Sequence, residues 1–85
     1  IFDLVFIDAD KENYVEYFKL IKPKVKTSSI IIFDNVLWYG KVLEENPKQE
    51  STKKIKELND LVAQDEDFEN LILPLRDGVN LMRKI

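Results

Sequence analysis

The sequence of 85 residues contains no cysteine, no histidine and only two glycines. Without cysteine and histidine, the chain cannot form disulfides, thiolate nucleophiles, Ser-His-Asp triads or the usual zinc sites. A metal ion would have to be held by oxygen ligands, which favours hard cations such as Mg²⁺, Ca²⁺ or Mn²⁺. The two glycines, Gly40 and Gly78, form no Gly-x-Gly run, so these residues contain no glycine-rich nucleotide loop.

The sequence also lacks a concentration of positive charge and a long hydrophobic run. Its net charge is -3, with Lys and Arg scattered among Asp and Glu, which argues against a nucleic-acid partner. No apolar stretch reaches the length of a membrane span, and the start is not a signal peptide, so we expect a cytoplasmic protein without a membrane partner. A composition of 45% hydrophobic and 34% charged residues is typical of one globular domain.

The first half of the chain has the pattern of two buried strands joined by a helix. Residues 2–7 and 30–33 are short apolar runs, as in strands covered on both faces. Between them, apolar residues recur every three or four positions from Asp10 or Lys11 to about Pro23, which predicts a helix capped by an Asp. Residues 27–29 read as a turn. Two such strands and their helix form a right-handed unit with parallel strands.

The second half predicts one more helix and a hairpin. Apolar spacing indicates a helix from about Ser51 to about Asp65, after a polar connection over residues 36–50. Strands are expected over residues 68–75 and 79–85, joined by a tight turn at Asp77-Gly78. The order β-α-β-α-β-β is an α/β fold whose last strand is antiparallel.

Polar side chains stand where the first two predicted strands end. Asp8 follows the first strand, and Asp34 and Asn35 end the second. If these strands are neighbours, about 4.8 Å separates them and the two carboxylates meet at the sheet edge where α/β proteins bind ligands. Two carboxylates about 4 Å apart repel by about 4 kcal/mol at an effective dielectric near 20, so a proton or a cation should neutralise them. Asn35 would supply a third, neutral oxygen ligand.

Lys11 is a candidate base at the same edge, in the first turn of the predicted helix. A cation beside this lysine should lower its pKa and allow it to accept a proton. Other roles remain open for each residue taken alone. An Asp at a strand end often caps the next helix, an Asp-Asn pair is common in turns, and an exposed Lys is often only solvated.

Three segments of the sequence resemble the cation-dependent O-methyltransferases of the caffeoyl-CoA O-methyltransferase-like family, which are related to catechol O-methyltransferase. Residues 6–14 (FIDADKENY) resemble the family's F-[IV]-D-A-D-K-x-N-Y segment, and residues 32–40 (IFDNVLWYG) resemble its DN-x-L-W-x-G segment. Residues 76–81 (RDGVNL) resemble its late DG-[LV]-x-L hairpin. The likeness runs over almost the whole chain, in order and with fitting spacing.

The resemblance implies a fold, two cofactors and a set of roles. The fold would be the C-terminal half of a Rossmann-like class I methyltransferase, with S-adenosylmethionine and a divalent cation, Mg²⁺ first, as cofactors and a small hydroxyl acceptor as substrate. Asp8, Asp34 and Asn35 match the metal ligands, and Lys11 and Asp8 the catalytic residues. The cofactor contacts would come from Asp8, Asp10 and Tyr17, and the acceptor contacts from Trp38, Tyr39 and Asn80.

The resemblance also implies that these 85 residues are the C-terminal portion of a single methyltransferase domain, without the N-terminal portion that binds most of the cofactor. We therefore expect the chain alone to be inactive. We also expect it to pair through the free edge of its first strand, with a second copy or with an N-terminal half.

Two further alternatives are compatible with the sequence. One is a non-catalytic fragment or interaction module. The other is a phosphoacceptor receiver domain, which would need an acidic pair on an earlier strand and a Lys after a later one.

Overall fold

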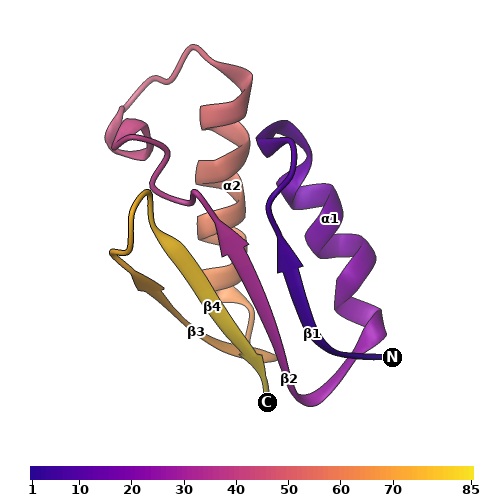
Figure 1. Ribbon diagram of the computed structural model, residues 1–85. Coiled ribbons are helices and arrows are strands. Elements are labelled where there is room, and N and C mark those ends of the chain that lie inside the picture. Colours follow the sequence, from indigo (N-terminus) through magenta and orange to yellow (C-terminus); the bar gives the residue numbers. More distant parts are fainter.

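The computed structural model describes all 85 residues as a four-stranded sheet with two α-helices (Figure 1). Short 3-10 turns at residues 11–13, 22–24 and 41–43 flank or link these elements. The predicted order β-α-β-α-β-β is confirmed. The elements are β1 (Phe2–Ile7), α1 (Tyr14–Ile21), β2 (Val25–Asp34), α2 (Glu50–Gln64), β3 (Phe68–Leu73) and β4 (Val79–Lys84).

The strands lie in the order β1-β2-β4-β3, so the last strand of the sequence is an inner strand of the sheet. β1 and β2 are parallel, and β4 is antiparallel to both of its neighbours. The predicted parallel pair and antiparallel last strand are therefore confirmed. The predicted free edge of the first strand is confirmed too, because β1 pairs only with β2.

Both helices cover the same face of the sheet, and the core lies between them and the strands (Figure 1). Apolar side chains three or four positions apart on each helix point inward, as the sequence pattern predicts. Phe33 lies at the centre, with its ring 5.3 Å from the ring of Tyr14 and 6.3 Å from that of Phe18. No helix is both long enough and apolar enough to cross a membrane.

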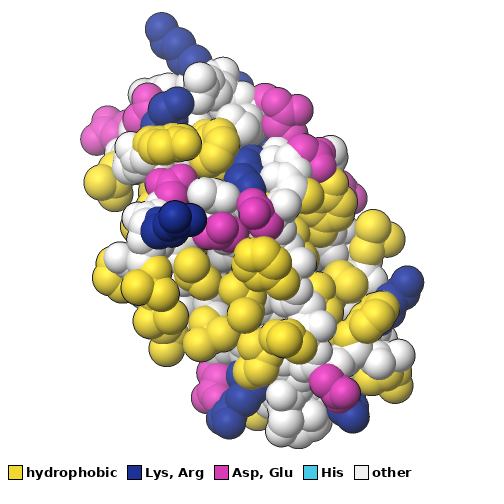
Figure 2. All heavy atoms as spheres, viewed as in Figure 1, with side chains coloured by type: hydrophobic (Ala, Val, Ile, Leu, Met, Phe, Trp, Pro, Cys, Tyr) yellow, Lys and Arg dark blue, Asp and Glu magenta, His cyan; other side chains and the backbone are white.

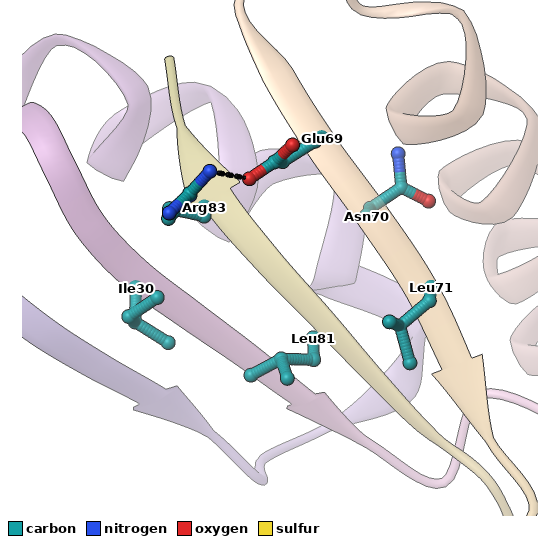
Figure 3. A pocket seen from close by; sticks show the side chains of 6 residues that line it. All are labelled: Ile30, Glu69, Asn70, Leu71, Leu81 and Arg83. Atoms are coloured by element: carbon teal, nitrogen blue, oxygen red, sulfur yellow. Dashed lines mark ion pairs between the residues drawn. The ribbon is translucent and has the colours of Figure 1, made fainter.

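The opposite face of the sheet is open and largely apolar (Figure 2). The strand register places Phe6, Ile32, Leu81 and Leu71 side by side across all four strands. Phe6 and Leu71 are 60% and 50% exposed. A hollow on this face, shown in Figure 3, is closed at one end by the ion pair of Glu69 and Arg83. The hollow is lined by Ile30, Glu69, Asn70, Leu71, Leu81 and Arg83.

β2 begins at Val25, earlier than the expected start at residue 30. The predicted turn over residues 27–29 is instead an irregularity within the strand, where the register shifts between Phe2 and Leu4 of β1. Ser28 adopts a left-handed backbone with φ of 77°. The Ser29 hydroxyl donates to the Phe2 carbonyl at 2.7 Å, so a side chain replaces a backbone bond of the ladder.

The loop between β3 and β4 spans residues 74–78 and is longer than the two-residue turn predicted at Asp77-Gly78. Gly78 has φ of 85°, and a Cβ there would lie 2.4 Å from Cγ of Leu37. Glycine is therefore required both by the backbone and by the close approach of the loop after β2. Backbone bonds from Val36 to Gly78 and from Leu37 to Asp77 join the two loops.

An ion pair at the end of α2 gives the fold a specific dependence on pH. The Lys22 ammonium donates to Asp65 at 2.6 Å, and the Asp65 side chain is only 8% exposed. Burial raises the pKa of this carboxyl, but Lys22 and the Asp67 backbone N–H outweigh burial, so the pKa lies below its ordinary 3.8. A carboxyl whose pKa is lower in the folded state stabilises the fold above its unfolded-state pKa. This stabilisation is lost as the pH falls through the folded-state value.

We therefore predict that Asp65→Asn lowers the free energy of unfolding at pH 7 and flattens its decline below pH 3.8. Urea unfolding at a series of pH values measures both effects. Asp67→Asn is the matched control, because its side chain is 58% exposed and lies 3.4 Å from Lys22. An equally steep acid decline in wild type and Asp65→Asn would contradict the assignment.

Candidate active site

The carboxyl ends of β1 and β2 bring Asp8 and Asp34 together, as the sequence predicts. Ile7 and Phe33 are the last pair in register. Asp8 directly follows β1, and Asp34 is the last residue of β2. Both carboxylates are close enough to the buried Tyr14 hydroxyl to raise its pKa, although burial is the larger cause. The hydroxyl therefore keeps its proton at neutral pH.

Asn35 follows with a left-handed backbone, φ 62°, a conformation that asparagine tolerates better than most residues. Its backbone N–H donates to Asp34 Oδ1 at 2.8 Å, and its side-chain Nδ2 donates to Asp77 Oδ2 at 3.4 Å. The second bond uses the amide nitrogen, so the amide oxygen remains available as a ligand.

Lys11 lies at the same edge, as predicted. Its Nζ donates to Asp8 Oδ1 at 3.0 Å and to the Ala9 carbonyl at 2.9 Å, and it lies 4.8 Å from the centre of the Tyr14 ring. Burial lowers the pKa of Lys11, but its interactions with Tyr14 and Asp8 outweigh burial, so the pKa is raised. The fall in pKa expected beside a divalent cation stays a prediction.

Asp10 and Tyr17, the predicted cofactor contacts, are hydrogen-bonded to each other. The bonds that Asp10 accepts from Tyr17 and Asn13 lower its pKa, and the bond to Asp10 raises the pKa of Tyr17. Asp10 makes no capping bond to a backbone N–H, so the prediction that an Asp caps the first helix is wrong. A groove between the free edge of β1 and α1 includes Asp8, Ala9 and Tyr17 in its lining.

The chain is similar over its whole length to known proteins. The family model described as O-methyltransferase matches residues 1–85. The chain belongs to the O-methyltransferase family. Caffeoyl-CoA O-methyltransferase from Petroselinum crispum is 40% identical over 90 residues, which cover 99% of this chain and 37% of that protein. Caffeoyl-CoA O-methyltransferase 5 from Nicotiana tabacum is 38% identical, covering 99% of this chain and 38% of that protein.

The fold is shared with solved structures of the same family. The crystal structure of the O-methyltransferase from Bacillus cereus in complex with SAH superposes with a TM-score of 0.91 at 26% identity. The match covers 99% of this chain and 40% of that chain. The Rossmann-like class I methyltransferase fold expected from the sequence is thereby confirmed, and the receiver-domain alternative is wrong. The chain spans less than two fifths of the length of the curated relatives named above.

Within this O-methyltransferase chain, the predicted acceptor contacts are not all in one place. Trp38 and Tyr39 are adjacent, with ring centres 5.5 Å apart, and Tyr39 is 76% exposed. Both have a left-handed backbone, with φ of 51° and 57°. Asn80 lies instead on the helix-covered face beside Phe33 and is 1% exposed. The structure therefore presents Tyr39 at the surface and keeps Asn80 in the core.

Two residues of the site were missed at the sequence level. Tyr14 was counted only as an apolar position of a helix, yet its hydroxyl donates to the Asp34 carbonyl at 2.7 Å. Asp77 was read only as a turn residue, yet it accepts bonds from the Asn35 side chain and the Tyr39 backbone N–H. Both residues lie in family-like segments, Asp77 in RDGVNL and Tyr14 at the end of FIDADKENY, and this placement was the signal that could have identified them.

The chemistry of the donor set fits a hard divalent cation. Asp8 and Asp34 supply two negative charges, and Asn35 supplies a neutral oxygen, which is the ligand type that Mg²⁺ and Ca²⁺ take. The Asp8 side chain is 50% exposed, so an ion can reach it from solvent. No group of three or more His, Cys, Asp and Glu side chains comes together in the chain. A cation here would therefore rely on the amide oxygen and on water or substrate oxygens for its remaining ligands.

Proposed function

We propose that the chain belongs to an S-adenosylmethionine-dependent O-methyltransferase that uses a divalent cation to hold a small, catechol-like hydroxyl acceptor. The observation that carries this proposal is that Asp8 and Asp34 directly follow Ile7 and Phe33, the last register pair of β1 and β2. Asn35 comes next after Asp34, and Lys11 is bonded to Asp8. The caffeoyl-CoA O-methyltransferase names of the relatives and the SAH complex of the Bacillus cereus protein support it.

Asp8, Asp34 and Asn35 would hold the cation, which when bound would polarise an acceptor hydroxyl. Lys11 is placed to take the proton of that hydroxyl on Nζ, and for this it must first be neutral. S-adenosylmethionine, when bound, would supply the methyl group for the deprotonated acceptor oxygen and would be released as the neutral thioether. The work of this chain is to orient the acceptor and to accept one proton.

Asp10 and Tyr17 would contribute cofactor contacts from the first turns of the helix segment. The Asp10 carboxylate, whose pKa is lowered, is ionised at neutral pH and can accept hydrogen bonds from a hydroxylated ligand. The 85 residues hold no Gly-x-Gly loop, so we expect their cofactor affinity to be low.

Calorimetric titration of the chain with MgCl₂ and, separately, with S-adenosylmethionine tests the proposal. We expect saturable Mg²⁺ binding. We expect little heat from the cofactor below about 1 mM, because a Kd of about 1 mM corresponds to a binding free energy of only about -4 kcal/mol. Cofactor binding at micromolar concentration would overturn the expectation that these residues provide only part of the cofactor site. Absence of Mg²⁺ binding would favour the alternative of a non-catalytic interaction module.

We also propose that a second copy of the chain pairs with the free edge of β1. This strand bonds only to β2, and Phe2, Leu4 and Phe6 along it are 49%, 62% and 60% exposed. An unpaired apolar edge is a template for another strand.

Sedimentation velocity should show dimers that Leu4→Lys converts to monomers, because a charge on an edge strand opposes pairing. Lys substitution at Leu43, which is 85% exposed and outside the sheet, is the control. A wild-type chain that is monomeric at all concentrations would contradict this.

A further inference from the structure

Tyr14 is fully buried, yet its hydroxyl makes two bonds at the edge where the site residues lie. It donates to the Asp34 carbonyl at 2.7 Å and is shared with the Ile7 carbonyl at 3.3 Å. Its ring packs on Phe33 inside the core, with 0% exposure of the residue. The ring of Tyr14 accounts for its packing in the core. Burying the hydroxyl is unfavourable unless it is hydrogen-bonded, so the two bonds need an explanation of their own.

The two carbonyls belong to the peptide groups that lead directly into the proposed ligands. The Ile7 carbonyl is in the same peptide group as the Asp8 nitrogen, and the Asp34 carbonyl is in the same group as the Asn35 nitrogen. Because a peptide group is planar, fixing its oxygen also fixes the direction in which the next residue leaves it. The Tyr14 hydroxyl thus links the ends of β1 and β2, the two strands that lead into the proposed ligands.

The regular pairing of β1 and β2 stops just before the proposed ligands. Asp8 is the first residue after β1, and the last register pair between the strands is Ile7 with Phe33. Beyond that pair β1 leads into the turn before α1, and β2 continues through Asp34 to the left-handed Asn35. The Tyr14 hydroxyl is therefore placed where the spacing of the two ends is decided.

We propose that Tyr14 is a positioning residue, which fixes the spacing of Asp8 against Asp34 and Asn35 and so makes the site select Mg²⁺ over Ca²⁺. Mg²⁺ requires ligand distances of about 2.0–2.1 Å in near-ideal octahedral geometry, whereas Ca²⁺ accepts about 2.3–2.6 Å in a flexible shell. A fixed spacing favours the smaller ion, and a loosened spacing favours the larger one. The inference rests on the proposed function, because it requires that these three residues bind a cation.

The test is Tyr14→Phe, which removes only the hydroxyl, with calorimetric titration of the chain by MgCl₂ and by CaCl₂. We expect Mg²⁺ affinity to fall about 10-fold, the usual lower bound for removing a group that orients metal ligands. Ca²⁺ affinity should change by less than about threefold, because its shell is flexible. The measured quantity is the ratio of the two affinities, which a general loss of stability does not change.

Val62→Ala is the matched control, because Val62 is buried on α2 and its replacement destabilises the core without touching either strand end. It should leave the Mg²⁺ to Ca²⁺ ratio as in wild type. A Tyr14→Phe ratio equal to that of wild type would overturn the proposal. So would an equal fall of both affinities in Tyr14→Phe and Val62→Ala.

Hydrogen exchange separates this inference from the proposed function. Tyr14→Phe should speed exchange of the Asp8 and Asn35 amides relative to the Ile31 amide in the middle of β2, with or without metal. If the wild-type chain binds neither ion, the proposed function fails for this chain and the selectivity claim fails with it. In that case faster exchange at Asp8 and Asn35 still supports the role of the hydroxyl in holding the strand ends, and unchanged exchange overturns it.

Discussion

Replacement of Asp34 by Asn is expected to lower the affinity of the chain for Mg²⁺ by about 100-fold or more while leaving the fold intact. The size follows from charge: two unit charges about 4 Å apart interact with about 4 kcal/mol at an effective dielectric near 20. Asparagine keeps the shape of the side chain and an oxygen that can still accept the Asn35 backbone N–H, now at 2.8 Å from Oδ1. Calorimetry with MgCl₂ measures the affinity, and circular dichroism checks the fold.

Asp60→Asn is the charge-matched control for this experiment. Asp60 is exposed on α2, and its replacement removes the same unit of negative charge from a residue that is not a proposed ligand. It should leave Mg²⁺ affinity within about twofold of wild type, since water and salt screen the charge of an exposed side chain. Equal affinity in wild type, Asp34→Asn and Asp60→Asn would refute the role of Asp34 as a ligand.

Replacement of Phe33 by Ala is expected to have the largest effect on stability, about 3–5 kcal/mol. Phe33 is 0% exposed and packs against Tyr14 from one helix turn and Phe18 from the next. An 85-residue chain has a total stability of about 4–13 kcal/mol, so this loss removes much of it. Urea unfolding followed by circular dichroism measures the change.

Phe6→Ala applies the same truncation at a side chain that is 60% exposed on the open face of the sheet. Its cost should stay below about 1 kcal/mol, because little apolar area leaves a buried environment. Phe33→Ala should have a second effect, because Phe33 directly precedes Asp34. The cavity that it leaves beneath the strand end should also weaken cation binding. Similar unfolding midpoints for the two alanine variants would show that the core is not centred on Phe33.

The fold was predictable where the residue pattern is local. The apolar run ending at Ile7 and the spacing of Ile55, Leu58 and Val62 each identify an element by its own periodicity, and the structure has those elements. The early start of β2 at Val25 was not predictable, because residues 26–29 are polar. They join the strand through the pairing of Val25 with Phe2 and the bond of the Ser29 hydroxyl to the Phe2 carbonyl, contacts between residues far apart in the sequence.

The site was predictable to the extent that strand ends determine it. The proximity of Asp8 and Asp34 follows from the rule that neighbouring parallel strands have their carboxyl ends at the same edge of the sheet. The burial of Asn80 depends on which face of the sheet its side chain occupies, and the exposure of Tyr39 depends on its left-handed backbone angles. The residue types alone specify neither property. The bonds of Asp77 to the loop after β2 depend on β4 lying beside β2, and sequence order does not imply this neighbour.

The position of β4 between β2 and β3 has a consequence for the order of events during synthesis. The pair of Asp34 with Val79 joins residues 45 positions apart, so β2 cannot acquire its second neighbour until the ribosome has released residues 79–84. Until then β3 also has no partner strand, because it bonds only to β4. Contacts of such high sequence separation form slowly. A nascent chain ending before Val79 would therefore leave β3 without a partner and β2 with one open edge, so closure of the sheet would be a late step.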